Sequence, residues 1–535
     1  MSARANERLA EQVVGAALGA GVKLVFVSPG SRSTPLVACF DRARRAGLVE
    51  LELVLDERSS AFAAVGAARA GSRAAVLTTS GTAVANLLPG LCEADRDELA
   101  LVAITADRPA LEVTAGANQT VLQMPLLAGP VRAALDLDAA SFEASLTGEL
   151  QACLSALDGP SPGPVHLNVR FSKPLEPTGE AGVPVASQRA QPHSPPPPTA
   201  RFEGVERGLV VVGALPGRAR PAVDRFLRQL PWPALVDLTS GLDRAPSGRF
   251  APGLLRAEAA RTRLEPDRVL WIGGRLTEPA VASWLKGREV HQWRAGDAVR
   301  DPDRLFTSSH HVNLVADLPN PVGSTPSELG LESLASHAPP LEPQLTEPFV
   351  ARTVVESTPA DEHLFVGNSM PIRDSDRFAR SLVANLLTNR GVSGIDGNLA
   401  TCFGAWRATG RPVRALIGDL TFLHDSGSLA LLSESQAPIR LVCLNNSGGG
   451  IFHQLPIVEH RELFEPWFGT PHGRDLTAIA RGYGLQAEPI QSAAELQARL
   501  AEPPDGPELF EIRTDRVANA RLHAELDRAY REGLL

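Results

Sequence analysis

Short apolar runs alternate with helical segments along residues 1–178, and this alternation constrains the possible fold more than any other feature. Strands that are joined through helices run parallel, and a parallel sheet needs helices on both of its faces. The pattern therefore predicts an α/β domain. The expected strands are 23–27, 51–55, 74–78 and 99–105.

The same alternation returns twice later in the chain, with expected strands at 208–212, 234–238 and 269–272 and at 415–417 and 439–444. Two Pro-rich stretches separate the segments, because runs such as Pro195–Pro198 pack neither as helix nor as central strand. We expect three doubly wound parallel-sheet domains of ordinary size. Their predicted limits are 1–178, 201–318 and 346–535, with boundaries at 179–200 and 319–343.

Polar residues close two of the apolar runs in the last segment. Gly418-Asp419 follows one run, and Asn445-Asn446 follows the next, 26 and 27 residues after Asp419. In a βαβ unit both would lie at the carboxyl ends of the strands, where such folds bind ligands. A carboxylate, an amide oxygen and a glycine-turn carbonyl suit Mg²⁺, which completes its shell with phosphate. A helix-capping Asp and an unrelated Asn-Gly turn would explain the bare pattern equally well.

Composition excludes several classes of protein. A net charge of −9 argues against a nucleic-acid partner, and no apolar run reaches the length of a membrane span. The N-terminus shows no apolar signal segment, and the five scattered cysteines form no Cys-x-x-Cys pair, so we expect a cytoplasmic protein. Lysine occurs at three positions only, so an anion site here would be built mainly from arginine. Segments 210–217 and 270–274 lack the glycine spacing of a nicotinamide site.

Four further segments make the comparison with a known family specific. Together with 418–420 and 445–452, they resemble the 2-succinyl-5-enolpyruvyl-6-hydroxy-3-cyclohexene-1-carboxylate synthase family, the thiamine-diphosphate enzymes of menaquinone synthesis. The resemblance runs through both outer domains, whereas in the middle domain only the layout is similar. The segments are 28–35, 79–86, 105–109 with 116–119, and 389–397.

The resemblance implies a thiamine-diphosphate-binding fold and a particular reaction. The cofactor would attack the ketone of 2-oxoglutarate, CO₂ would leave, and the resulting carbanion would add to the ring alkene of isochorismate. It also implies a homodimer or homotetramer, in which the first domain of one copy and the third domain of another meet at a subunit interface.

Roles for single residues follow from the same resemblance. Glu57 would be the catalytic carboxylate that activates the cofactor's aminopyrimidine. Without the resemblance, Glu57 would be an ordinary acidic residue in a helix's first turn, and the apolar residues below would be core packing. Mg²⁺ (or Mn²⁺) would be held by Asp419, Asn446 and the Gly448 carbonyl, and the cofactor would also contact Gly418, Ile395, Ile451 and Phe452.

Both substrates are dicarboxylates, which arginine forks bind through paired, charge-assisted hydrogen bonds. Any single arginine is more often solvated or structural, and Arg108 also suits a plain turn between Asp107 and Pro109. The family can place a lysine after the Leu276-Thr277 position; this chain has none there, and Arg275 is a candidate substitute. The implied substrate residues are Ser31, Arg32, Arg108, Asn118, Gln119, Ser369, Arg373, Arg390 and Leu455.

Two alternatives stay open from the sequence. One is another thiamine-diphosphate enzyme acting on 2-oxo acids, such as an acetolactate synthase or a decarboxylase. The other is a catalytically inactive relative that binds a nucleotide or acts as a scaffold. The presence of Glu57 together with Asp419 and Asn446 argues against the second alternative.

Overall fold

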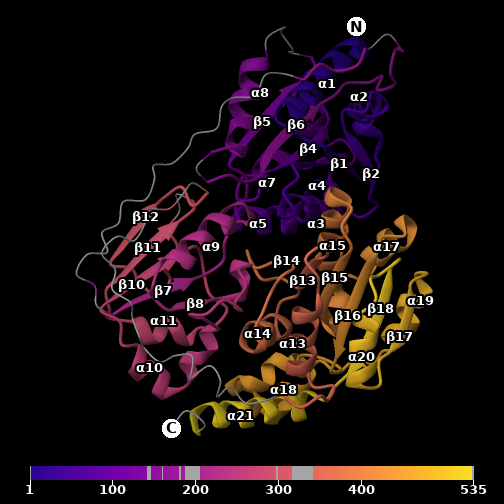
Figure 1. The fold of residues 1–535 in the computed structure, drawn as a ribbon. Helices are drawn as coiled ribbons and strands as arrows, with labels where there is room; N and C mark the ends of the chain where they lie inside the picture. Colours follow the sequence, from indigo (N-terminus) through magenta and orange to yellow (C-terminus); the bar gives the residue numbers. More distant parts are fainter. Residues whose placement is uncertain are drawn as a thin grey trace. The chain divides into compact units, whose positions relative to one another are not determined.

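The computed structural model describes residues 2–140, 146–159, 161–179, 182–186, 205, 207–296, 299–315, 318 and 341–532. Within them the strands form three six-stranded sheets, all of whose paired strands are parallel, with helices around them (Figure 1). The predicted α/β class is confirmed. The predicted boundaries at 179–200 and 319–343 lie largely outside the described residues, so the domain limits stay predictions.

The chain divides into two compact units, and each is described by itself. The first comprises residues 1–194, 389–410 and 425–431, and it holds the first sheet. The second comprises residues 195–388, 411–424 and 432–535, and it holds the other two sheets. Segment 389–410, which the sequence pattern places in a third domain, therefore makes its contacts in the first unit.

The first sheet is a doubly wound sheet in which the strand order reverses between β1 and β3. Ligands bind at such a reversal, outside the carboxyl ends of the strands. Its strands, in order across the sheet, are β2 (Glu50–Leu53), β1 (Leu24–Val27), β3 (Ala74–Thr78), β4 (Leu101–Asp107), β6 (Val165–Arg170) and β5 (Ala133–Asp138).

Helices cover both faces of this sheet because alternate strand residues point to opposite sides. Val25 and Val27 join a buried core with α1, α2 and α8, whereas Phe26 between them contacts Phe403 of α15, at 6.4 Å between ring centroids. The helices of this unit are α1 (Ser2–Gly19), α2 (Thr34–Arg45), α3 (Glu57–Arg69), α4 (Thr82–Asn86), α5 (Leu88–Arg96), α6 (Ala110–Thr114), α7 (Gln123–Leu127), α8 (Thr147–Leu154) and α15 (Asn398–Thr409).

Helices α3 and α15 approach each other closely because glycines lie at their crossing. A Cβ atom on Gly404 would lie 1.8 Å from the carbonyl oxygen of Ala63, and one on Gly66 would lie 2.0 Å from that of Thr401. Both obstacles are backbone atoms, so neither position has room for a larger residue. This crossing fixes α15 against α3, the helix that begins at Glu57.

The second unit contains one sheet of each doubly wound type. The middle sheet has the strand order of dinucleotide-binding folds, and the last sheet repeats the order of the first. Across the middle sheet lie β12 (Ser308–His311), β11 (Val290–Arg294), β10 (Arg268–Ile272), β7 (Gly208–Val212), β8 (Ala234–Val236) and β9 (Arg249–Phe250). Across the last lie β14 (Asn385–Leu387), β13 (His363–Val366), β15 (Val413–Gly418), β16 (Ile439–Asn445), β18 (Glu508–Arg513) and β17 (Gln486–Pro489).

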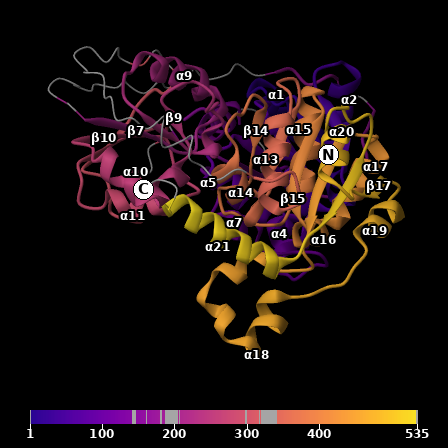
Figure 2. The ribbon, with the colours of Figure 1, turned by 60° about the horizontal axis from the view of Figure 1, so that its bottom comes forward.

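The long C-terminal helix α21 (Arg516–Glu532) connects the two sheets of this unit (Figure 2). Its Asp527 forms an ion pair at 3.1 Å with Arg256, which lies between β9 and β10 of the middle sheet. The other helices are α9 (Arg220–Gln229), α10 (Glu258–Leu264), α11 (Ala280–Leu285), α13 (Glu347–Ser357), α14 (Met370–Phe378), α16 (Asp419–His424), α18 (Arg461–Phe464), α19 (Leu476–Gly482) and α20 (Ala493–Leu500), with α17 (Leu429–Ser435) divided between the units.

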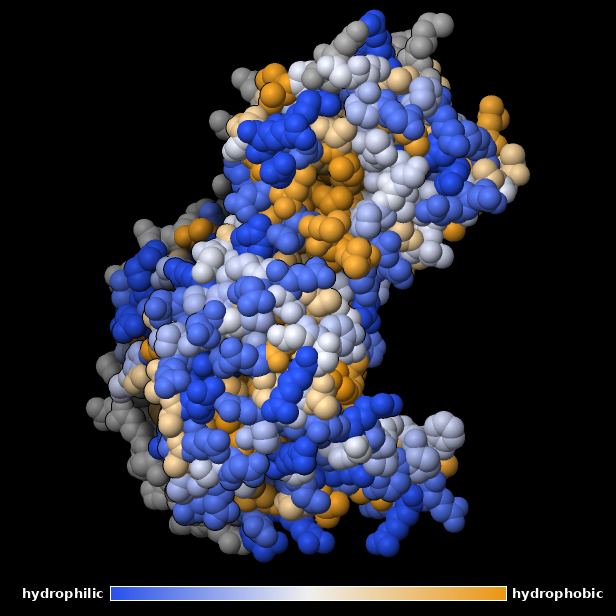
Figure 3. Space-filling view, turned by 90° about the vertical axis from the view of Figure 1, so that its right-hand side faces the viewer, coloured by the Kyte–Doolittle hydropathy of each residue, from blue (hydrophilic) through white to orange (hydrophobic). Residues whose placement is uncertain are grey.

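Apolar side chains gather on one face of the part that holds the first sheet, in the upper half of Figure 3. Two large apolar side chains next to Glu57 are exposed: Leu53 at 60% and Leu55 at 69%. Contiguous exposed apolar surface marks many protein interfaces, whereas single exposed leucines are normal on any surface. None of the helices within the described residues has both the length and the apolar character needed to cross a bilayer.

Candidate functional site

Asp419 is the first residue of α16 and directly follows β15, so its carboxylate lies at the carboxyl end of the last sheet. Its Oδ2 accepts hydrogen bonds from the Gly448 amide (2.9 Å) and from His472 Nε2 (3.1 Å). The side chain is buried, which raises its pKa, while the bonds from His472 and Gly448 oppose that rise. These contacts fix the carboxylate beside the turn that follows β16.

Asn446, in that turn, is oriented by a buried carboxyl group. Its Nδ2 donates to Glu347 Oε1 at 2.9 Å, and Thr514 donates to the same oxygen at 2.9 Å. Burial, with Asp374 nearby, raises the pKa of Glu347 to about 7. Because the amide nitrogen is held by Glu347, the Asn446 oxygen must point the other way.

The donor set fits a hard divalent cation. Asn446 Oδ1 is buried and has no hydrogen-bond partner within the described residues. A buried acceptor in that state is costly unless a ligand satisfies it. Across the described part of the chain, no cluster of three or more His, Cys, Asp or Glu side chains forms a metal site. A cation here would therefore rely on one carboxylate, an amide oxygen and a carbonyl, with remaining positions open to phosphate.

Gly448 allows the turn to close around this position. Its φ is +140°, and a Cβ atom would lie 2.0 Å from the Gly469 carbonyl oxygen and 2.8 Å from Arg516 Nη1. Only glycine fits such backbone geometry and such close contact. The turn therefore brings the Gly448 backbone to Asp419, whose carboxylate its amide contacts at 2.9 Å.

The predicted apolar contacts lie in and after the short 3-10 helix Gly450–Gln454. Ile451 and Phe452 are half-buried, and the Phe452 ring packs edge-on against Phe468 at 5.5 Å between centroids. Leu455 is 46% exposed. None of the three is among the buried hydrophobic residues of the described chain, in contrast to the core-packing explanation that the sequence alone favours. Gly418 ends β15 directly before Asp419.

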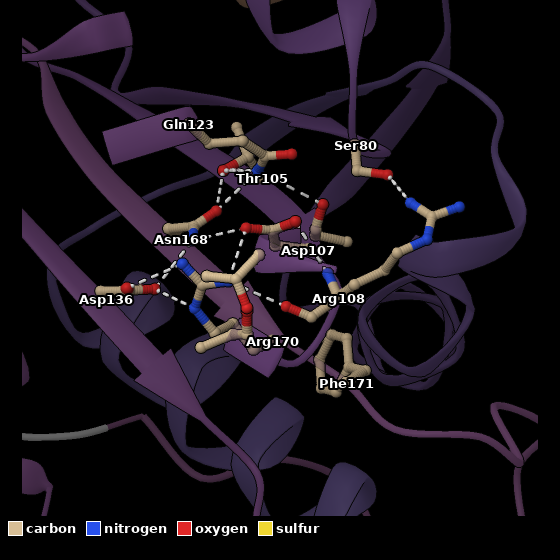
Figure 4. A network of polar contacts seen from close by, with 12 residues as sticks. Ser80, Thr105, Asp107, Arg108, Gln123, Asp136, Asn168, Arg170 and Phe171 are labelled. Atoms are coloured by element: carbon tan, nitrogen blue, oxygen red, sulfur yellow. Dashed lines mark hydrogen bonds and ion pairs between the residues drawn. The ribbon is translucent and has the colours of Figure 1, made fainter. Parts of the chain in front are cut away.

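In the first unit, the Arg108 side chain reaches Ser80 beyond the ends of β3 and β4 (Figure 4), and it also contacts Gln119. Arg108 Nη1 donates to Ser80 Oγ (2.6 Å) and to the Gln119 carbonyl (2.8 Å). Arg32 is buried, donates to the Phe171 carbonyl at 2.7 Å, and has its pKa lowered by burial and by the nearby charge of Arg108. Ser31 and Asn118 are exposed neighbours of these residues in the chain.

A buried polar network supports this group from the strands below it. Asp107 accepts from the Arg108 amide at 2.8 Å and forms an ion pair with Arg170 at 3.0 Å. Asn168 donates to both Asp107 (3.2 Å) and Asp136 (2.8 Å), as Figure 4 shows. Arg108 is thus held in a fixed network, which a plain surface turn would not provide.

Glu57 begins α3, and the preceding Asp56 caps the helix by accepting from the Arg58 amide at 2.8 Å. The Glu57 side chain is half-buried, and its Oε2 accepts a hydrogen bond from Asn86 Nδ2 at 3.2 Å. Asn86 ends α4, which follows β3. The carboxylate therefore lies at the same edge of the first sheet as Ser80, with one oriented donor.

Arg390 and Ile395 also lie in the first unit, on the segment that precedes α15. Both are half-buried. Buried Glu93 holds this segment by accepting from the amides of Gly391 and Val392, each at 2.8 Å. Burial raises the pKa of Glu93 despite its ion pair with Arg69.

Ser369 and Arg373 lie in the second unit, after β13. Ser369 has a φ of +70°, a conformation rare for residues other than glycine and often found at functional sites. Arg373 Nη1 donates to the Ser369 carbonyl at 2.8 Å, and its side chain is exposed. Arg275, the candidate substitute for the family lysine, is exposed after β10.

The predicted residues thus form two groups, one in each unit, at the carboxyl ends of the first and last sheets. Three contributing residues were not assigned from the sequence. Asn86 lay inside a matched segment and could have been found. Glu347 and His472 lie 99 residues from Asn446 and 53 from Asp419, respectively, and no local pattern marks them.

Comparisons with known proteins agree with this geometry. Residues 7–126 match the family model "Thiamine pyrophosphate enzyme, N-terminal TPP binding domain", and residues 377–512 match the corresponding C-terminal TPP binding domain. Three similar proteins are named 2-succinyl-5-enolpyruvyl-6-hydroxy-3-cyclohexene-1-carboxylate synthase. They come from Salinibacter ruber (38% identity over 96% of this chain and 95% of the relative), Rubrobacter xylanophilus (37%, 98% of each) and Haloarcula marismortui (33%, 95% of each).

Proposed function

Because the chain belongs to the 2-succinyl-5-enolpyruvyl-6-hydroxy-3-cyclohexene-1-carboxylate synthase family, we propose that it makes this compound in menaquinone biosynthesis. The substrates are 2-oxoglutarate, which loses CO₂, and isochorismate, to which the remaining four-carbon unit is added. The observation that carries the proposal is the near-full-length similarity to synthases of that name. This similarity favours the synthase over an acetolactate synthase or a simple decarboxylase.

When bound, thiamine diphosphate supplies the carbon chemistry of the decarboxylation and the carbon–carbon bond formation. The chain's own part is to hold the diphosphate end through Mg²⁺ or Mn²⁺. We assign the metal to the Asp419 carboxylate, Asn446 Oδ1 and the Gly448 carbonyl. The unpartnered Asn446 oxygen and the Asp419 carboxylate beside it support this assignment.

Glu57 is the proposed catalytic residue. Its half-buried carboxylate can share a proton with the cofactor's aminopyrimidine, while Asn86 holds the other carboxylate oxygen in place. Ile395, Ile451 and Phe452 would provide the apolar contacts of the rings, and Gly418 leaves space next to Asp419. The half-buried state of these side chains supports such a role.

Recognition of the two dicarboxylates falls to the arginines of the matched segments. Arg32 and Arg108 lie close enough for their positive charges to repel each other. A carboxylate bound between them would neutralise this repulsion, which favours binding of an anion at this position. The proposed substrate residues are Ser31, Arg32, Arg108, Asn118, Gln119 and Arg390 in the first unit, with Ser369, Arg373 and Leu455 in the second.

The proposed assembly is a homodimer, or a homotetramer made of two such dimers, in the cytoplasm. Glu57 from one copy would complete the site whose metal is held by its neighbour. The exposed Leu53 and Leu55 beside Glu57 support an interface at this edge.

An assay with both substrates tests the function. The purified chain with thiamine diphosphate, Mg²⁺, 2-oxoglutarate and isochorismate should form the named product, followed by mass spectrometry. Omission of either substrate should abolish product formation, and pyruvate alone should give no acetolactate. Product from pyruvate alone would instead establish the acetolactate synthase alternative. Failure to bind thiamine diphosphate with Mg²⁺ in calorimetry would favour an inactive relative.

A further inference from the structure

A cavity of ≈ 300 Å³ lies in the second unit, and neither Asp419 nor Asn446 lines it. It is formed by the loop and strand around β9, by α13, by the end of α14 and by α21. Its polar lining consists of five guanidinium groups and one phenol: Arg244, Arg249, Arg352, Arg377, Arg380 and Tyr530.

No carboxylate is found among the described residues that line this cavity. Asp376 and Asp224 bind Arg244 and Arg249 from outside the lining, and both arginines are almost completely buried. These two pairs form a fixed, fully satisfied part of the wall. Glu356 pairs with Arg352 Nε at 3.2 Å.

The three other guanidinium groups, those of Arg352, Arg377 and Arg380, outnumber their two carboxylate partners among the described residues, Glu356 and Asp527. Arg380 is exposed, and within the described residues its guanidinium forms no ion pair. Arg377 is only 7% exposed, yet its Nε has no hydrogen-bond partner in the described structure, although the group pairs with Asp527. Burying a charged donor without an acceptor is costly. An anion in the cavity would reduce this cost.

The rest of the wall is apolar and partly aromatic. Phe250, Leu254, Leu341 and Phe378 line it together with the Tyr530 ring. The Arg377 guanidinium carbon lies 4.9 Å from the Phe378 ring centre and 5.4 Å from that of Tyr530. A hydrated inorganic ion would leave this surface uncovered. The volume is at the small end of the range for ligand sites.

From this lining we propose that the cavity binds a small organic carboxylate with a planar apolar body. The carboxylate lies between Arg352, Arg377 and Arg380, where guanidinium forks can bind both oxygens. The body packs on Phe250, Phe378 and Tyr530. Helix α14 begins at Met370, next to Ser369, and ends at Phe378 in this wall, so the ligand contacts the helix that carries Arg373.

The test uses 4-fluorobenzoate and the full chain loaded with thiamine diphosphate and Mg²⁺, with binding followed by ¹⁹F NMR. We expect one saturable site. Arg352→Gln and Arg380→Gln should each weaken binding about tenfold, as loss of a charge-assisted hydrogen bond does. Both residues are partly or fully exposed, so these variants should fold. Arg45→Gln is the matched control, since Arg45 also forms an i,i+4 ion pair on a helix, with Asp41; its binding should be unchanged.

Two further probes separate charge from shape. Neutral 4-fluorobenzamide should bind at least about tenfold more weakly, because the guanidinium groups need a charged partner. Inorganic phosphate should compete poorly, because it has no apolar body. The proposal is overturned if no saturable binding occurs, if both arginine variants bind like wild type, or if the amide or phosphate binds as well as the carboxylate.

Discussion

Glu57 is the residue with the most specific proposed role, as the carboxylate that activates the cofactor. In Glu57→Gln the amide can still accept from Asn86, so thiamine diphosphate should bind nearly as in wild type. Exchange of the cofactor's C2 proton should slow by roughly 10²-fold or more, the usual size of a lost acid–base contribution. Quenched-flow deuterium exchange read by NMR measures this rate, with Asp56→Asn as the control for damage to the start of α3.

A wild-type exchange rate in Glu57→Gln would remove the catalytic assignment. Slow exchange in Asp56→Asn as well would mean that helix capping, and not the carboxylate of Glu57, sets the rate.

Strand ends and spacing pointed to Asp419 and Asn446 as candidate metal ligands, and the family resemblance pointed to Glu57; these roles stay predictions. Neither the spacing nor the resemblance pointed to Glu347 or His472. These residues reach Asn446 and Asp419 only through the packing of α13 and of a loop far along the chain. Such partners are determined by tertiary structure, and a local sequence pattern contains no information about them.

At the scale of elements, the crossing of α3 and α15 depends on glycine. Gly404→Ala places a methyl group 1.8 Å from the Ala63 carbonyl, so the helices must separate. We expect a loss of about 1–3 kcal/mol, typical of overpacking, and a midpoint of thermal unfolding lowered by a few degrees.

Gly148→Ala is the control, because a Cβ atom on this residue of α8 meets nothing within 4 Å. Its midpoint should stay within about a degree of wild type or rise slightly, since alanine favours a helix. Equal midpoints for the two variants would show that the crossing tolerates a side chain.

Asp425 makes the start of α15 sensitive to pH. It accepts from the Leu399 amide at 2.8 Å, and burial raises its pKa from 3.8 to about 6. A carboxyl group whose pKa is higher in the folded protein than in the unfolded chain stabilises the folded state at pH values below its unfolded pKa. That contribution is lost as the pH rises through the folded pKa. Wild type should therefore lose stability relative to Asp425→Asn between pH 4 and pH 6, by up to about 3 kcal/mol.

The measurement is the difference in thermal midpoint between wild type and Asp425→Asn across this range. The midpoint of Asp425→Asn should rise relative to that of wild type as the pH rises, and the difference should become constant above pH 6. A constant difference would mean that the bonds from Leu399 and Ser428 keep Asp425 ionised throughout.

Apolar runs bounded by turn residues predicted β3 and β7 at their observed limits. They predicted the other seven expected strands to within one or two residues at each end. Strand order was beyond the sequence, because it depends on which helices cover which face. The placement of segment 389–410 with α3 was also missed. It depends on the close contact of Gly66 and Gly404 with a partner helix more than 300 residues away.

At the scale of the whole molecule, the predicted site residues fall into two groups of one chain, with Glu57 in the first unit and Asp419 in the second. The proposed dimer makes each site from both groups, one from each copy. This gives a distinctive expectation for mixed dimers, since two different defects then gather in the same site and leave the other site intact.

The most direct measurement is activity after co-expression of Glu57→Gln and Asp419→Ala chains, each inactive alone. Random pairing makes about half of the dimers mixed, each with one intact site, so the mixture should recover about a quarter of wild-type activity with 2-oxoglutarate and isochorismate. Glu57→Gln paired with Glu57→Ala should recover none. A Glu57→Gln and Asp419→Ala mixture no more active than its parents would contradict a site completed by the neighbouring copy.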